Sequence, residues 1–129
     1  LGSDPEFKGG KCLSLQVSAP FHCSLMKPAQ EEMTAPLSQT SYSRLSFPVL
    51  CNVTANLNTS EYSIASLLID QITQPVLWEQ SMKKLKEFGA QNIIEVGPGK
   101  VLTGLMKRID PSIGLFNIGS VDQLKEVLK

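Results

Sequence analysis

Apolar residues recur along the chain with two different periods, which predict strands in some segments and helices in others. In CLSLQVS (12–18), leucine and valine alternate with polar residues, as they do in a half-buried strand. In SLMKPAQEEM (24–33), apolar residues instead return every three or four positions, as on one face of a helix. The same reasoning predicts strands at 12–18, 47–53, 92–96 and 114–119, and helices at 24–33, 64–72, 78–88, 100–109 and 121–129.

Prolines, glycines and capping residues set the expected ends of these elements. Pro36 should end or kink the first helix, and Pro75 should close the second. Gly89 is a C-terminal stop for the third helix. Ser120 and Gln123 have the spacing of a capping box for the last helix.

Strands that alternate with helices imply an α/β architecture with a mostly parallel sheet. The polar stretch TANLNTS (54–60) is expected to form a turn after a buried strand at 47–53. Residues 1–7, LGSDPEF, show no periodicity and contain dipeptides that common cloning sites encode, so we interpret them as a cloning remnant. A length of 129 residues accommodates one domain.

Composition narrows the class of protein. Twelve basic and twelve acidic residues cancel, which gives no support to nucleic-acid or membrane-surface binding. No apolar run approaches the ~18 residues of a spanning helix, and no signal peptide opens the chain. Three widely spaced cysteines are an odd number, which favours free thiols in a reducing compartment. The expected location is therefore the cytoplasm.

His22 is the only histidine, and it lies between a predicted strand and a predicted helix. A lone histidine is more often structural than catalytic, but strand-to-helix loops are where catalytic groups gather in open α/β sheets. Pairing with the adjacent Cys23 is disfavoured, because neighbouring residues on a helix point in different directions. No C-x-x-C motif occurs, so the ligand spacing of a zinc site is absent.

Two further patterns have simple interpretations. GPGKVLTG (97–104) invites a phosphate-loop interpretation, but it fits neither common glycine-rich motif, and a tight strand-to-helix turn is favoured. The chain contains no G-x-S-x-G nucleophile elbow. A local excess of positive charge is typical of a solvated helix face, or of a surface for an acidic partner; it comprises Lys83, Lys84, Lys86, Lys107 and Arg108.

Three segments together resemble one enzyme family. VSAPFHCSLMKPA (17–29), DQITQPVLWEQSM (70–82) and EVGPGKVLTGLMKRI (95–109) resemble, in order and spacing, the malonyl-CoA:acyl carrier protein transacylases of bacterial fatty-acid synthesis. The resemblance runs from about Lys11 to the C-terminus. It implies the C-terminal part of a hydrolase-like, parallel-sheet acyltransferase subdomain over 20–129, preceded at 11–19 by the last strand of a ferredoxin-like small subdomain.

The resemblance also implies a mechanism. Family members move malonyl from coenzyme A to the pantetheine thiol of acyl carrier protein through a serine ester, without a cofactor or metal. The general base falls on His22, and the glutamine whose backbone carbonyl holds the base through its Nδ1 proton falls on Gln71. Phe21 would border the acyl α-carbon and select malonyl over methyl-branched units. The five basic residues would help to attract the acidic carrier protein.

The chain departs from the family pattern in what it lacks. The serine elbow, the arginine that binds the malonyl carboxylate and a glutamine near the oxyanion hole belong to the family's N-terminal half, a missing partner of this chain. We therefore expect the chain alone to be inactive and to expose apolar faces. Two other hypotheses stay open: a protein-binding α/β module without catalysis, and an acyltransferase domain of a polyketide-type synthase.

Overall fold

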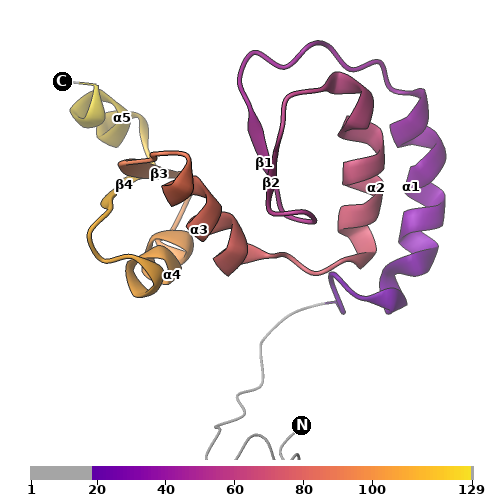
Figure 1. Cartoon of the computed structure of the whole chain (residues 1–129), viewed down its shortest axis with the longest axis horizontal. Helices are drawn as coiled ribbons and strands as arrows, with labels where there is room; N and C mark the ends of the chain where they lie inside the picture. The colour runs from indigo at the N-terminus through magenta and orange to yellow at the C-terminus, as the bar shows by residue number, and fades with distance from the viewer. Residues whose placement is uncertain (1–18, 129) are drawn as a thin grey trace, which may run out of the picture.

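The computed structural model describes residues 19–128. The predicted strand at 12–18 and residues 1–7 lie outside the described residues, and the proposed subdomain boundary stays a prediction. The described chain forms two groups of elements, which the segment from residue 74 to 77 connects (Figure 1). The first group consists of α1 (Lys27–Gln39), α2 (Ile64–Thr73) and the strands β1 (Val49–Cys51) and β2 (Asn56–Asn58).

Helices α1 and α2 lie side by side, each preceded by a short 3-10 turn, η2 (Ser24–Met26) and η3 (Glu61–Ser63) respectively (Figure 1). Pro28 occupies the first turn of α1, where its missing N–H costs nothing. Pro36 was expected to end or kink this helix; the helix continues past it to Gln39, so it does not end at the proline. Pro36 has no N–H to donate to the carbonyl of Glu32, but only residues 37–39 of the helix follow it.

The hairpin between α1 and α2 differs from the prediction. Only Val49–Cys51 of the expected strand is extended, and it pairs antiparallel with Asn56–Asn58. The stretch predicted as a polar turn thus contains a strand, and a turn with Ala55 at φ +51° connects the two. The expectation of a buried strand was also wrong, since β1 is exposed or half-buried throughout.

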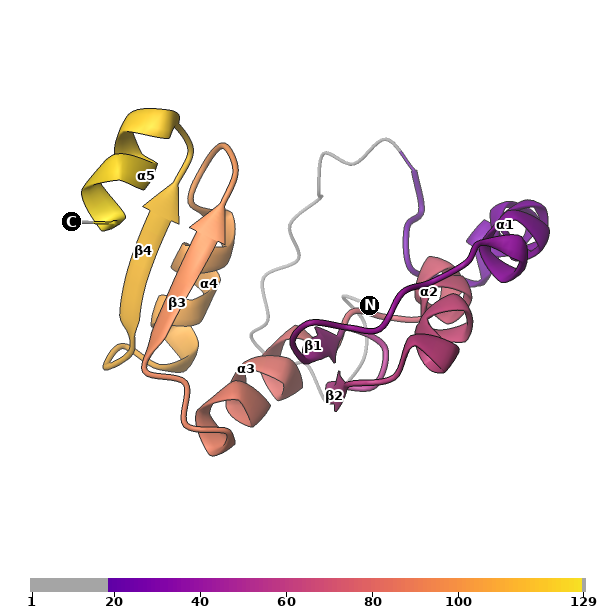
Figure 2. The ribbon, with the colours of Figure 1, turned by 90° about the horizontal axis from the view of Figure 1, so that it is seen from above.

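The second group contains the parallel sheet that the sequence predicts. Strands β3 (Asn92–Val96) and β4 (Gly114–Ile118) pair in parallel, with Asn92 opposite Gly114 and Val96 opposite Ile118. Helix α4 (Val101–Ile109) connects them and lies against one side of the pair (Figure 2). Helix α3 (Trp78–Glu87) precedes the unit and α5 (Val121–Val127) follows it. The α/β class is therefore confirmed, with an antiparallel hairpin in addition.

Helix ends follow the expected chemistry. Gly89 adopts φ +83° after α3, a left-handed conformation that ends helices and that glycine adopts without strain. The Ser120 hydroxyl accepts the N–H of Gln123 at 3.3 Å. The Gln123 side chain returns to accept the N–H of Gly119 at 2.7 Å, one residue before the position of a standard capping box.

The core of the described residues is small, and one sheet face is open. Met106 of α4 is only 1% exposed and anchors the packing against β3 and β4. Ile94, Val96 and Phe116 project from the other face of the sheet, with Val96 77% exposed. Parallel sheets are usually covered on both faces, so this face has the character of an interior surface. Among residues 19–128, no helix is long and apolar enough to cross a membrane.

Candidate functional site

His22 lies in a tight turn immediately before η2. Its φ is +59°, in the left-handed region that a residue with a Cβ rarely adopts. The N–H of Phe21 donates to the carbonyl of Ala19 at 2.9 Å and helps to close the turn. Such strain concentrates at functional sites, but Ala55 has a similar φ in an ordinary hairpin turn, so strain alone assigns no role to His22.

One hydrogen bond fixes the histidine ring across 49 residues of sequence. Nδ1 of His22 lies 2.8 Å from the backbone carbonyl oxygen of Gln71, in the last turn of α2. A carbonyl only accepts, so this geometry requires the proton on Nδ1 and leaves the lone pair of Nε2 unused. The ring is exposed, and Nε2 can therefore reach a group outside the described residues. The contact is the one that the family resemblance implies, while the catalytic roles of both residues stay predictions.

Gln30 connects α1 to α2 beside this contact. Its side-chain nitrogen donates to the carbonyl of Ile69 at 2.9 Å and to the hydroxyl of Thr73 at 3.2 Å. These two partners lie two residues before and two residues after Gln71. The relative position of the two helices, and hence the distance from His22 to Gln71, is tied to a polar contact as well as to packing.

The side chain of Gln71 makes a separate contact with the hairpin. Its Oε1 accepts from the amide nitrogen of Asn52 at 3.3 Å, just after β1. The carbonyl of Asn52 in turn accepts the N–H of Leu77 at 2.9 Å. Asn52 of the hairpin thus contacts both the last turn of α2 and the segment that connects α2 to α3.

Phe21 does not lie at the apolar cavity beside α2. The Phe21 side chain is 55% exposed beside His22. A cavity of about 230 Å³ lies between β1 and α2, with Leu50, Leu67 and Gln71 among its lining residues, whereas Phe21 and His22 do not line it. The cavity therefore does not include the histidine, and the selecting role of Phe21 stays a prediction.

The start of α4, just after the glycine-containing loop, binds a carboxylate of the chain itself. Both oxygens of Glu95 accept backbone N–H groups at the start of α4, from Leu102 at 3.1 Å and Thr103 at 2.9 Å. The Thr103 hydroxyl and the Asn117 amide also donate to it, at 2.6 and 3.0 Å. These bonds, those from Thr103 first, lower the pKa of Glu95 to about 2. The helix start that a phosphate would use is already occupied, which supports the simple turn.

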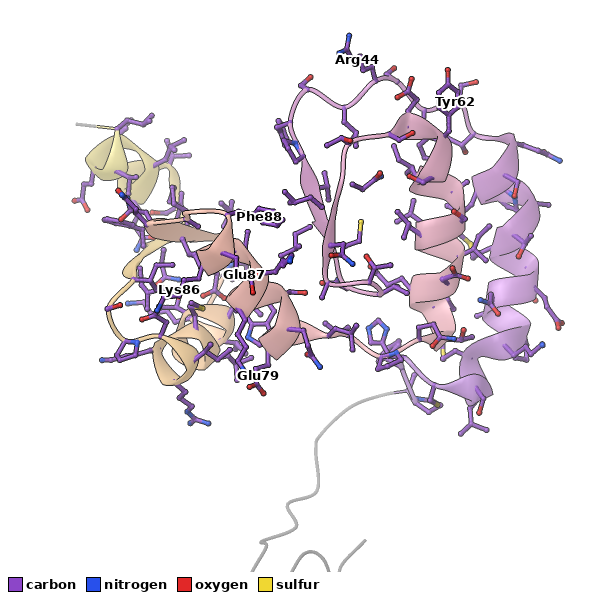
Figure 3. All side chains as sticks on the ribbon, in the orientation of Figure 1. Arg44, Tyr62, Glu79, Lys86, Glu87 and Phe88 are labelled. Atoms are coloured by element: carbon purple, nitrogen blue, oxygen red, sulfur yellow. The ribbon has the colours of Figure 1, made fainter. Side chains whose placement is uncertain are left out.

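Three of the five basic residues are engaged within the chain. Lys83 pairs with Glu79 at 2.6 Å and Lys84 with Glu87 at 2.8 Å, along the helix that Figure 3 shows with its labelled side chains. Lys86 pairs with Asp110 at 2.7 Å and, with Ser112, lowers the pKa of that carboxyl to about 2. Among residues 19–128, Lys107 and Arg108 make no ion pair. The interpretation as a solvated helix face therefore fits the lysines of α3. The alternative, a surface for an acidic partner, stays a prediction and now concerns mainly Lys107 and Arg108 at the end of α4.

No metal site is built into this part of the chain. Within residues 19–128, no three histidine, cysteine, aspartate or glutamate side chains are grouped so that they could hold an ion. Burial raises the pKa of the Cys51 thiol, which makes it a poor nucleophile.

Sequence reasoning missed the residues that support the contact. Gln30 and Asn52 carry no motif, because their importance comes from helix and hairpin placement that periodicity does not encode. Glu95 had a usable signal: a carboxylate that ends a strand, seven residues before the first turn of the next helix, can cap that helix.

Comparison with known proteins gives a consistent answer. No family model matches the chain. The chain is 41% identical over 99 residues to a malonyl CoA-acyl carrier protein transacylase from Salmonella typhimurium, a match that covers 77% of this chain and 32% of the relative. It spans about a third of the length of the curated relatives it matches.

Solved structures agree in fold. The structure of MCAT from Streptococcus pneumoniae superposes with a TM-score of 0.87 at 37% identity, covering 95% of this chain and 40% of that one. A malonyl-transacylase in complex with its type II polyketide acyl carrier protein superposes with a TM-score of 0.84 at 35% identity, over 90% of this chain and 38% of that one. In sequence and in fold, the chain thus matches the C-terminal portion of the malonyl-CoA:acyl carrier protein transacylases.

Proposed function

We propose that this chain is the base-bearing part of an acyltransferase that moves malonyl from coenzyme A to acyl carrier protein. The chain covers about a third of its relatives, so the activity belongs to a polypeptide that also contains the rest of the family's fold. The single observation that carries the proposal is the 2.8 Å contact from His22 Nδ1 to the Gln71 carbonyl. With Nδ1 bound to this carbonyl, the ring has a fixed orientation, and the lone pair of Nε2 is available to accept a proton.

The proposed chemistry has two balanced steps. His22 Nε2 takes the proton of a serine hydroxyl supplied by the rest of the fold, the serine oxygen bonds to the thioester carbon, and the carbon–sulfur bond breaks. The coenzyme A thiolate leaves with the proton from His22. In the second step, the pantetheine thiol gives its proton to His22 and its sulfur bonds to the malonyl carbon. The bond from that carbon to the serine oxygen breaks, and His22 returns the proton to the serine oxygen.

The chain's own residues perform the orienting part of this cycle. The Gln71 carbonyl accepts from Nδ1 throughout, so the ring does not rotate between taking and giving the proton. A neutral carbonyl fixes the tautomer without a second negative charge next to a substrate that itself carries a carboxylate. The end of α2, where the helix dipole is negative, favours the cationic ring that forms after proton transfer.

The proposal includes the partners, the specificity and the location. Phe21 selects malonyl, and Lys107 and Arg108, with a contribution from the lysines of α3, contact the acidic carrier protein. The open face of the β3–β4 sheet packs against the rest of the longer protein, because Ile94, Val96 and Phe116 need cover. The reaction is one of fatty-acid synthesis in the cytoplasm, and the protein needs no cofactor beyond its substrates.

The test uses the whole reading frame that encodes this chain. The encoded protein should transfer radiolabelled malonyl from coenzyme A to holo acyl carrier protein, as a thioester that neutral hydroxylamine releases. A carrier protein whose attachment serine is replaced by alanine is the control, since it has no pantetheine thiol. A purified full-length protein that labels neither itself nor the carrier would contradict the proposal and favour a binding module.

A further inference from the structure

The Gln71 carbonyl accepts from His22 because it has no hydrogen-bond donor within its own helix. Inside a helix, the carbonyl of residue 71 would accept the N–H of residue 75, four positions later. The preceding carbonyl does so in the ordinary way: Asp70 accepts the N–H of Gln74 at 2.9 Å. Residue 75, however, is Pro75, which has no backbone N–H. Gln71 therefore has no helical donor to satisfy its carbonyl.

Pro75 also stops the helix at the right place. The residue before a proline is driven out of the helical region, and Gln74 is extended, with φ −88° and ψ 151°. The helix ends at Thr73, so the Gln71 carbonyl stands in an open last turn, where a side chain from another element can reach it. That side chain is the ring of His22.

We propose that Pro75 is a positioning residue for the base, because it withholds the N–H that would compete with His22 for the Gln71 carbonyl. The inference rests on the proposed function for its catalytic meaning, since it acts through the residue assigned as the base. An alanine at position 75 would restore an N–H and allow α2 to extend by a turn. The Gln71 carbonyl would then accept within the helix, and the Nδ1–H tautomer of His22 would lose its partner.

The tautomer of His22 is directly measurable, because it is the only histidine of the chain. The 129-residue chain, labelled with ¹⁵N-histidine and recorded at alkaline pH, should show Nδ1 protonated and Nε2 unprotonated. Unrestrained imidazole side chains prefer the opposite tautomer. Pro75→Ala should shift the spectrum toward the Nε2–H form. Pro36→Ala, a matched proline removal at the end of α1, should leave it unchanged.

A third variant separates the missing N–H from the proline ring. Lactic acid at position 75, introduced as an ester in the backbone, has neither ring nor N–H. It should keep the Nδ1–H tautomer, as Pro75 does, whereas alanine loses it. If the alanine and lactic acid variants give the same spectrum, whether through a shared fold or a shared loss of fold, the withheld N–H is not the cause and the inference is overturned. A wild-type chain with the Nε2–H tautomer overturns it as well.

Kinetics in the full-length protein complete the test. Pro75→Ala should lower kcat about 2–10-fold, the range that one net hydrogen bond is worth, with KM unchanged. An unchanged kcat would overturn the inference. The outcomes remain distinct from a failure of the proposed function: a full-length protein that transfers no malonyl, but whose His22 responds to the three variants as stated, would refute the activity and not the positioning.

Discussion

The region that contains His22 (residues 19–77) and the βαβ unit (residues 92–118) are held together in different ways. In the first, the decisive contacts join residues far apart in sequence, such as His22 with Gln71 and Gln30 with Ile69. In the second, Glu95 accepts hydrogen bonds from the next helix along the chain, α4, and from the adjacent strand, β4. The His22 region leaves an unused lone pair on an exposed ring, whereas the carboxylate of the βαβ unit is fully engaged.

On the proposed function, this difference distinguishes a reacting group, His22, from a supporting one, Glu95. A base must have one atom held and another free, which is the state of the His22 ring. Both oxygens of Glu95 accept hydrogen bonds from other residues of the chain. These bonds stabilise the charged carboxylate and lower its pKa, so the lowered pKa reflects a structural role and does not indicate a group that transfers protons. A carboxylate with a perturbed pKa, near the end of a strand and before a glycine-containing loop, would otherwise be the stronger candidate for chemistry. The hydrogen bonds that each group makes therefore favour His22 over Glu95 as the reacting group.

The largest expected effect concerns the chain on its own. It contains no G-x-S-x-G motif, so on the proposed function it carries a base but no nucleophile. Pure 129-residue chain incubated with radiolabelled malonyl-CoA should keep no covalent label after denaturation, whereas the full-length protein should keep close to one malonyl per molecule. Stoichiometric labelling of the short chain would show that another side chain is acylated.

Phe21 offers a test of specificity within the His22 region. Phe21→Ser in the full-length protein should narrow the preference for malonyl over methylmalonyl by up to about 10–200-fold, the range that one methyl group is worth in a pocket. The change should come mainly from slower malonyl transfer. Competition between the two coenzyme A esters measures the ratio of kcat/KM values. Phe47→Ser, another exposed phenylalanine, is the control, and equal ratios for all three proteins would exclude a selecting role for Phe21.

Glu95 offers the corresponding test in the βαβ unit, and here the effect should be on stability. Its pKa falls from 4.5 to about 2 on folding, so its contribution to stability is complete above about pH 4.5 and lost as the pH falls through about 2. Glu95→Gln should therefore lower the melting temperature at pH 7 and show no deficit near pH 2. Circular dichroism melts against pH measure this directly.

The matched control for Glu95 is an exposed carboxylate on α3. The pKa of Glu79 is lowered by its bond to Lys83, but the pair is on the surface and screened by solvent. Glu79→Gln should change the melting temperature little at any pH. A Glu79 variant as unstable as the Glu95 variant would mean that general surface charge, not the cap of α4, accounts for the effect.

The smallest expected effect is on carrier recognition. Charge reversal of Lys107 and Arg108 should weaken binding of the acidic carrier protein and flatten its salt dependence. Reversal of Lys83 and Lys84, which already pair within α3, should do less. Titration of holo carrier protein into each full-length variant at low salt measures both. Identical affinities for the two double variants would remove the distinction between the helices.

The fold was predictable where one period dominates a segment. NIIEV was expected as a strand at 92–96, and that is β3, because a short apolar run stops at Gly97, where the turn begins. Strand β2 was missed, since Asn56 and Asn58 have low strand propensity and only pairing with β1 makes them extended. The helix end was also misplaced, since α1 continues for three residues beyond Pro36 before it ends at Gln39.

The site was predictable only in part. His22 attracted attention as a single histidine at a strand-to-helix junction, but its partner came from the resemblance, since no periodicity connects residues 22 and 71. Pro75 was assigned as a helix stop, and its missing N–H acquires meaning only when another element brings a donor to the Gln71 carbonyl. Contacts between residues so far apart in the sequence depend on how the helices pack, which the pattern of apolar residues does not determine.

The most direct test of the central claim is the rate at which the full-length protein forms its malonyl ester. Rapid-quench measurement with radiolabelled malonyl-CoA should show His22→Ala slowed by roughly 10³-fold or more, because loss of a general base costs about 10²–10⁴ and coupled groups cost more. Gln71→Ala should remain near the wild-type rate, since the substitution keeps the backbone carbonyl that accepts from Nδ1. A His22→Ala protein that acylates as fast as wild type, or a Gln71→Ala protein that is the slower of the two, would contradict the assignment of His22 as the base and of the Gln71 carbonyl as its support.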